Sequence, residues 1–161
     1  CYDTLIDQGL KAKLAMEHNV CTKAVENIIE ANTLLSGIGF ESAGLAGAHA
    51  IHNGLTVLEA SHDYYHGEKV AFGTLVQLML ENAPMEEIEE VLQFCIDVGL
   101  PVSLAQLGLA DATPGDIRKV AQAATAEGES IYNMPFPVDT EMVYAAIYAA
   151  DSIGRYYLDL E

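Results

Sequence analysis

Residues 43–60 read AGLAGAHAIHNGLTVLEA, a stretch that is very rich in glycine and alanine. Each glycine lowers the stability of a helix by about 1 kcal/mol relative to alanine. Several glycines together therefore favour a helix whose backbone approaches its neighbours closely, rather than one that faces solvent. The alternation of apolar and polar residues that is typical of a strand is missing. We predict that this stretch forms an inner helix of an all-α fold.

Helical periodicity extends along nearly the whole chain on both sides of this stretch. We expect a turn at Gly37 and Gly39, with Ser42 capping the glycine-rich helix. The run VAFGTLVQLML (70–80) is apolar on all sides and predicts a central, buried helix. The other predicted helices span about 1–18, 22–36, 84–98, 113–128 and 139–160. The sequence thus predicts an all-α bundle of about seven helices, in one domain over residues 1–161.

Charge and cysteine content limit the classes of partner and compartment. Lys and Arg number 7 against 24 Asp and Glu, so the formal net charge is −17. Such a charge repels nucleic acid and anionic membranes, and we expect neither as a partner. The three cysteines are odd in number and form no CxxC pair, which favours free thiols in a cytoplasmic protein. Cys95 lies on the apolar stripe of its helix and is expected to be buried.

Histidines are concentrated beside and within the glycine-rich stretch. Four of the five lie between positions 49 and 66: His49, His52, His62 and His66. His49 and His52 share a helix face, and a helix hairpin would bring His66 toward them. Neutral imidazole binds zinc, iron and other first-row metals. A purely structural role for these side chains remains open from the spacing alone, and we expect His18 and His62 at the surface.

Two stretches of the sequence resemble a known enzyme family. GFESAGLAGAHAIHNGLT (39–56) and YHGEKVAFGTLVQL (65–78) are similar to the C-terminal helical domain of bacterial glycerol dehydrogenases. These are metal-dependent, or "iron-containing", alcohol dehydrogenases with a dehydroquinate synthase-like fold. The likeness extends to ENAPMEEIE (81–89) and VAQAATAEGESIYNMP (120–135). Because the chain starts at Cys1 within a helical pattern, we expect a C-terminal fragment without the family's NAD-binding domain.

The resemblance also implies roles for individual residues. His49 and His66 match the two histidine ligands of a zinc ion, whose third ligand is an aspartate outside this chain. His52 is expected near the metal, behind the ligands or as a proton relay, and Phe40 matches an aromatic residue near the glycerol pocket. Zinc lowers the pKa of a bound hydroxyl. The resemblance therefore implies a parent enzyme that oxidises glycerol, and related small polyols, to ketones such as dihydroxyacetone with NAD.

No part of this chain is expected to bind NAD, because it has no glycine-rich turn between a strand and a helix. We therefore expect the isolated chain to be inactive and, where its apolar surface is exposed, to form homo-oligomers. Two alternatives remain open. One is an iron-dependent polyol or alcohol dehydrogenase, although iron members use three histidines and an aspartate. The other is a non-enzymatic helical interaction module, against which the costly glycine-rich helix argues.

Overall fold

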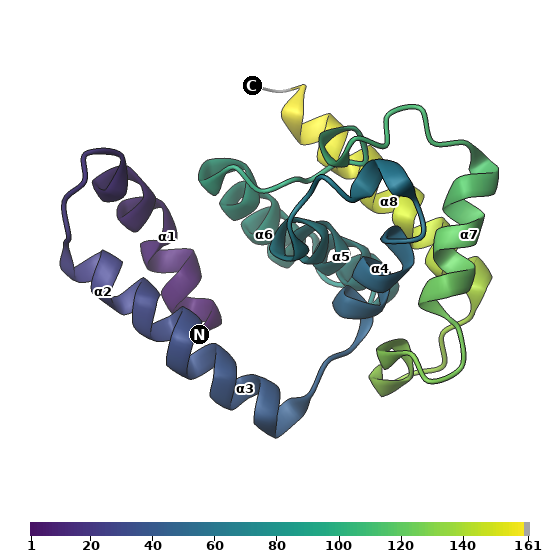
Figure 1. Cartoon of the computed structure of the whole chain (residues 1–161), viewed down its shortest axis with the longest axis horizontal. Helices are drawn as coiled ribbons and strands as arrows, with labels where there is room; N and C mark the ends of the chain where they lie inside the picture. The colour runs from purple at the N-terminus through teal and green to yellow at the C-terminus, as the bar shows by residue number, and fades with distance from the viewer. Residues whose placement is uncertain (160–161) are drawn as a thin grey trace. The chain divides into compact units, whose positions relative to one another are not determined.

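The structure is a computed structural model that describes residues 1–159. These residues form helices and contain no strand, which confirms the predicted all-α fold (Figure 1). The α-helices are α1 (Tyr2–Glu17), α2 (Lys23–Glu30), α3 (Ser36–Ala43), α4 (Gly47–Leu55), α5 (His66–Leu80), α6 (Met85–Val98), α7 (Pro114–Ala124) and α8 (Thr140–Leu158). A π-helical turn spans Ala31–Leu35, and 3-10 turns span Glu59–Ser61, Ala105–Leu107 and Ser130–Asn133. Within the described part of the chain, each helix is too short or too polar to span a membrane.

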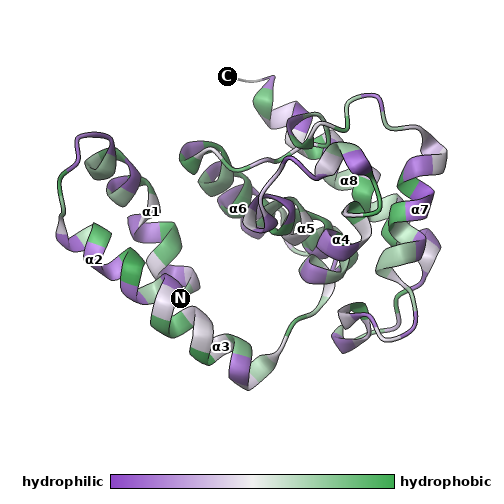
Figure 2. Ribbon diagram, viewed as in Figure 1, coloured by the Kyte–Doolittle hydropathy of each residue, from purple (hydrophilic) through white to green (hydrophobic). Residues whose placement is uncertain are grey.

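The chain divides into two compact units. The first unit comprises Cys1–Gly44 and Asp97–Gly99, and the second comprises Leu45–Ile96 and Leu100–Glu161. In the first unit α1 packs against α2 and buries Ala12, Val25 and Ala31. This unit also exposes many large apolar side chains, and Figure 2 shows hydrophobic residues along α2 and α3. The exposed large apolar residues of this unit are Tyr2, Leu10, Leu14, Met16, Val20, Ile29, Leu34, Leu35, Ile38 and Phe40.

The turn expected at Gly37 and Gly39 is not formed, and this prediction was wrong. Both glycines lie within α3, which ends only at Gly44, where φ is +73°. Glycine weakens a helix but adopts helical angles freely, so two of them do not end a helix that continues on both sides. Ser42 also lies inside α3, and α4 begins instead after Ala46.

The second unit is built around four helices. α4 packs against α5 and α7, and α8 packs against the same two helices on the other side of the core. α5 is the predicted central helix, with Phe72, Leu75 and Val76 fully buried. The core is completed by other large side chains that are fully buried: Ile51, Leu55, Leu92, Leu107, Ile117, Ile131 and Ile147. One apolar cluster therefore holds α4 and α5, the two histidine-bearing helices.

Helix backbones approach closely at glycines in this unit, as the sequence predicts. A Cβ at Gly73 of α5 would lie 2.4 Å from the carbonyl oxygen of Ala48 in α4. A Cβ at Gly54 of α4 would lie 2.5 Å from the carbonyl oxygen of Val120 in α7. No real Cβ sits so close to a backbone oxygen. The glycines therefore let α4 sit against both α5 and α7.

The later helices begin close to the predicted positions 113 and 139, although α7 ends at Ala124 rather than near 128. Thr113 caps α7 in a capping box with Asp116, and Asp139 caps α8 by accepting a hydrogen bond from the Met142 N–H at 2.9 Å. Hydrogen bonds from Lys119 and Thr113 lower the pKa of Asp116 to about 2. α6 ends before Gly99, where φ is +85°.

Cys95 on α6 is only 3% exposed, as predicted, whereas Cys1 and Cys21 are exposed. Burial raises the pKa of the Cys95 thiol to about 11.

The thiolate is the nucleophilic form, so we expect Cys21 to react quickly with a thiol reagent at about pH 8 and Cys95 to react only after unfolding. Mass spectrometry of peptides from chain labelled with and without denaturant measures both rates. Equal labelling of Cys95 and Cys21 in the folded chain would contradict this packing.

Candidate metal centre

Three of the four clustered histidines come together between α4 and α5. The ring centroids of His49 and His66 are 5.3 Å apart, with their planes at 45°. The ring of His52 is nearer to His66, with centroids 4.2 Å apart in an edge-to-face arrangement. Nε2 of His52 lies 3.1 Å from Nδ1 of His66, within hydrogen-bond distance. The predicted pairing of the two helices around His66 is therefore present, and His52 makes its closest contact.

The separation of His49 and His66 fits two ligands of one ion. Two imidazoles bound to a tetrahedral zinc, with Zn–N bonds of about 2.0–2.1 Å, have ring centroids about 5 Å apart. The observed 5.3 Å is close to that value. In residues 1–159, no group of three or more His, Cys, Asp and Glu side chains is arranged to hold a metal ion. The donor set offered by these residues is thus a pair of imidazoles that needs a further ligand.

The surroundings of His49 and His52 favour neutral imidazole, which is the metal-binding form. Burial lowers the pKa of His49, and the neighbouring His66 and His52 lower it further. Burial also lowers the pKa of His52, where a hydrogen bond with Asn53 acts in the opposite direction and His66 and Lys69 add to the lowering. Lone pairs on the rings of His49 and His52 are therefore available at neutral pH.

The N-terminus of α4 is held by a hydrogen bond to α5 rather than capped by the side chain of its N-cap residue. Ala46 occupies the N-cap position, and its methyl group cannot accept a hydrogen bond. Instead Oε1 of Gln77, on α5, accepts a hydrogen bond from the Ala48 N–H at 2.9 Å. This bond lies beside the contact of Ala48 with Gly73. Together these two contacts determine the position along α5 at which α4, the helix that carries His49, begins.

The connection from α4 to α5 is held by a buried lysine. Nζ of Lys69 donates hydrogen bonds to the carbonyl oxygens of Ser61 at 3.0 Å and Tyr64 at 2.9 Å. The Ser61 hydroxyl donates to the carbonyl oxygen of Leu55 at 2.8 Å. Because Lys69 is only 6% exposed, these bonds are well shielded from water. They anchor the loop immediately before His66.

A second set of hydrogen bonds links α4 to the segment after α7. Nδ1 of His52 lies 3.0 Å from Oδ1 of Asn53, and Nδ2 of Asn53 donates to Oε2 of Glu129 at 2.9 Å. Sequence reasoning missed Asn53 and Glu129, and it also missed Gln77 and Lys69. Asn53 and Glu129 are 76 positions apart, and nothing in their spacing signals that they meet.

The remaining candidate residues are His62, His18 and Phe40. His62 is exposed, as expected, and its Nε2 is 2.8 Å from the carbonyl oxygen of Thr56. His18 is exposed at the end of α1. Phe40, expected near a polyol pocket, belongs to α3 in the first unit and is 54% exposed.

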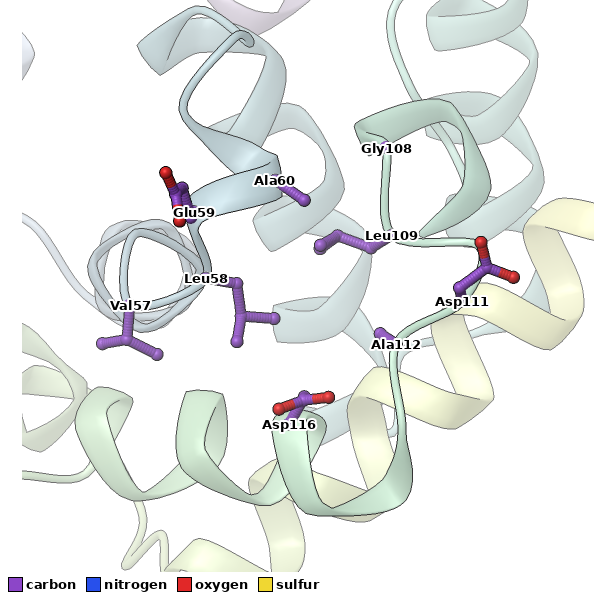
Figure 3. Close-up of a pocket in the computed structure, with 9 residues that line it drawn as sticks. All are labelled: Val57, Leu58, Glu59, Ala60, Gly108, Leu109, Asp111, Ala112 and Asp116. Carbon is purple, nitrogen blue, oxygen red and sulfur yellow. The ribbon is translucent and has the colours of Figure 1, made fainter.

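A cleft of about 400 Å³ lies in the second unit. Figure 3 shows Leu58 and Leu109 pointing toward each other across it, with Asp111 and Asp116 at its edge. The residues that line it do not include the clustered histidines: they are Val57, Leu58, Glu59, Ala60, Gly108, Leu109, Asp111, Ala112 and Asp116. Hydrogen bonds from Thr113 and Lys119 already engage Asp116.

No family model matches the sequence, whereas individual proteins do. Glycerol dehydrogenase from Citrobacter freundii is 63% identical over 158 residues, which are 98% of this chain and 43% of that protein. The crystal structure of a probable glycerol dehydrogenase from Sinorhizobium meliloti superimposes with a TM-score of 0.93 at 54% identity, over 97% of this chain and 44% of that one. Glycerol dehydrogenase from Schizosaccharomyces pombe gives a TM-score of 0.94 at 43% identity, over 99% of this chain and 41% of that one.

The chain is homologous to the glycerol dehydrogenases. This finding confirms the resemblance seen in the sequence. The chain spans about 43% of the length of its curated relatives, so it aligns with part of a glycerol dehydrogenase rather than with the whole. The all-α fold is the fold of the matched part in the solved structures.

The contact at Gly73 generates a direct test of how the site is assembled. Gly73→Ala places a methyl group against the Ala48 carbonyl oxygen, so α4 must move away from α5. We expect a loss of about 1–3 kcal/mol in unfolding free energy. Chemical denaturation followed by circular dichroism measures it, and nuclear Overhauser contacts between the His49 and His66 rings should weaken.

Gly67→Ala is the matched control on the same helix, because a Cβ there meets open space. It should raise the unfolding free energy by about 0.4–1 kcal/mol. If both variants changed stability equally, the close approach of α4 and α5 at Gly73 would be disproved.

Proposed function

We propose that this chain is the C-terminal, metal-binding part of an NAD-dependent glycerol dehydrogenase, and that His49 and His66 hold its zinc ion. The observation that carries the proposal is the pair of imidazoles with centroids 5.3 Å apart, in a homologue of the glycerol dehydrogenases. The third ligand is an aspartate contributed from outside residues 1–161. The NAD-binding domain of the enzyme likewise lies outside this chain.

The donor set supports zinc rather than iron. Two neutral imidazoles and a carboxylate are a common catalytic zinc set that leaves one position open. Iron would be favoured if His52 joined as a third histidine. However, Nε2 of His52 lies 3.1 Å from Nδ1 of His66, so His52 is hydrogen-bonded to a ligand and its Nε2 is not free for the metal. In this arrangement His52 orients His66.

Each residue of the site has a task in the proposed reaction. A bound zinc ion supplies the Lewis acidity that eases loss of the alcohol proton. His49 and His66 fix the position of the ion, and Lys69 holds the loop before His66 in place. His52, in contact with His66, is proposed to support that ligand or to pass on a proton. Phe40 is proposed to contact glycerol or another small polyol.

Two wider features of the parent enzyme follow from the described residues. The ten large apolar side chains exposed in the first unit support burial against a further surface, and we propose a homo-oligomer. The three cysteines are free, which supports a reducing cytoplasm as the compartment.

Metal binding tests the proposed site directly. We expect zinc to bind the 161-residue chain with one ion per chain, and His49→Ala or His66→Ala to weaken binding at least about tenfold because each removes a ligand. Equilibrium dialysis with metal analysis measures the affinity. His18→Ala, which removes an exposed imidazole of the first unit, is the control and should bind like the unmodified chain. Unchanged affinity in both ligand variants would contradict the zinc assignment.

Activity measurements test whether this chain needs the rest of the enzyme for catalysis. The 161-residue chain supplied with zinc, NAD and glycerol should form NADH at the background rate, because positioning of the two reactants contributes roughly 7–11 kcal/mol of a barrier. The full-length protein should oxidise glycerol and 1,2-propanediol faster than simple monohydric alcohols. Turnover by the pure 161-residue chain would contradict the first expectation. A preference for monohydric alcohols would contradict glycerol as the substrate.

A further inference from the structure

Four side chains form a continuous line of hydrogen bonds that ends at a candidate ligand. It runs from Glu129 through Asn53 and His52 to His66. The carboxylate of Glu129 can only accept hydrogen bonds, so Asn53 must turn its NH2 group toward it. The carbonyl oxygen Oδ1 of Asn53 is then the atom that faces His52. One acidic side chain therefore decides the orientation of the amide.

The orientation of Asn53 decides the proton positions on both histidines. Oδ1 of Asn53 can only accept, so Nδ1 of His52 must carry a hydrogen. A neutral His52 then has its lone pair on Nε2, which faces Nδ1 of His66 at 3.1 Å. Nδ1 of His66 must donate to it. His66 is left with its lone pair on Nε2, and that nitrogen is available to a metal ion.

We propose that Glu129 and Asn53 are positioning residues that, through His52, set the tautomer and ring orientation of His66. The metal-binding part of this inference rests on the proposed function, whereas the tautomer itself does not. Ligating histidines commonly donate their second ring N–H to a neighbouring acceptor, which fixes the ring. Here the acceptor is the imidazole of His52. The carboxylate of Glu129 acts on it through Asn53 and so determines which ring nitrogen of His52 carries the hydrogen.

The segment that carries Glu129 is itself held against α4. The hydroxyl of Ser130 donates to the carbonyl oxygen of Ala46 at 2.9 Å, and Nδ2 of Asn133 donates to the carbonyl oxygen of Leu45 at 2.7 Å. Ile131, between them, is fully buried. These contacts keep Glu129 in reach of Asn53 and join the segment after α7 to the histidine site.

Nitrogen-15 NMR of the imidazole rings in the metal-free chain reads the tautomers directly, at about pH 8, where histidines are neutral. We expect the hydrogen on Nδ1 of both His52 and His66. Asn53→Ala and Glu129→Ala should move His66 toward a mixture of the two tautomers. Glu129→Gln should preserve the native tautomer, because its amide oxygen still accepts from Asn53. A hydrogen on Nε2 of His66 in the unmodified chain would overturn the inference.

Zinc affinity of the same variants tests the positioning role. Asn53→Ala and Glu129→Ala should each lose about tenfold, whereas Glu129→Gln should bind like the unmodified chain. Glu127→Ala is the control, because it removes a negative charge from the same exposed segment and should leave both the tautomer and the affinity unchanged. Equal losses in Glu127→Ala and Glu129→Ala would reduce the effect to net charge and overturn the positioning role. If the unmodified chain failed to bind zinc, the proposed function would fail. The NMR result alone would then decide whether the hydrogen bonds from Glu129 to His66 set the tautomer.

Discussion

The carbonyl oxygen of Ala48 rests against α5 at the one position, Gly73, where the absence of a side chain leaves room for it. Around this contact, Gln77 accepts a hydrogen bond from the Ala48 N–H, and Gly54 allows α4 to approach α7 in the same way. The position of His49 relative to His66 follows from the resulting placement of α4. The glycine-rich composition, which weakens α4 as an isolated helix, is thus what permits a histidine pair to form.

The features that could be predicted from the sequence are those fixed by local chemistry. Apolar periodicity predicted the buried helix α5, and the predicted helix starts near 113 and 139 agree with those of α7 and α8. The glycine-rich stretch predicted close packing, which Gly73 and Gly54 confirm. The same reasoning was wrong at Gly37 and Gly39, because the cost of a glycine is small and says little about whether a helix ends there.

The features that could not be predicted depend on contacts between distant residues. Family likeness selected His49 and His66, but spacing alone left a structural role open. The bond between Asn53 and Glu129 joins positions that are far apart in the chain, and neither residue type is unusual on a surface. Nothing in the sequence marks Lys69, whose ammonium group donates hydrogen bonds to two carbonyl oxygens in the structure. Family likeness thus supplied the candidate ligands His49 and His66, and the structure shows which side chains form hydrogen bonds around them.

The central claim is that close packing of α4 on α5 prepares His49 and His66 to share one metal ion. Anomalous X-ray diffraction at the zinc edge, from crystals of the 161-residue chain grown with zinc, tests this most directly. We expect one peak per chain, about 2.0–2.1 Å from a ring nitrogen of each of these two histidines. Separate peaks on the two rings, or a peak on other side chains with His49 and His66 both unliganded, would contradict it.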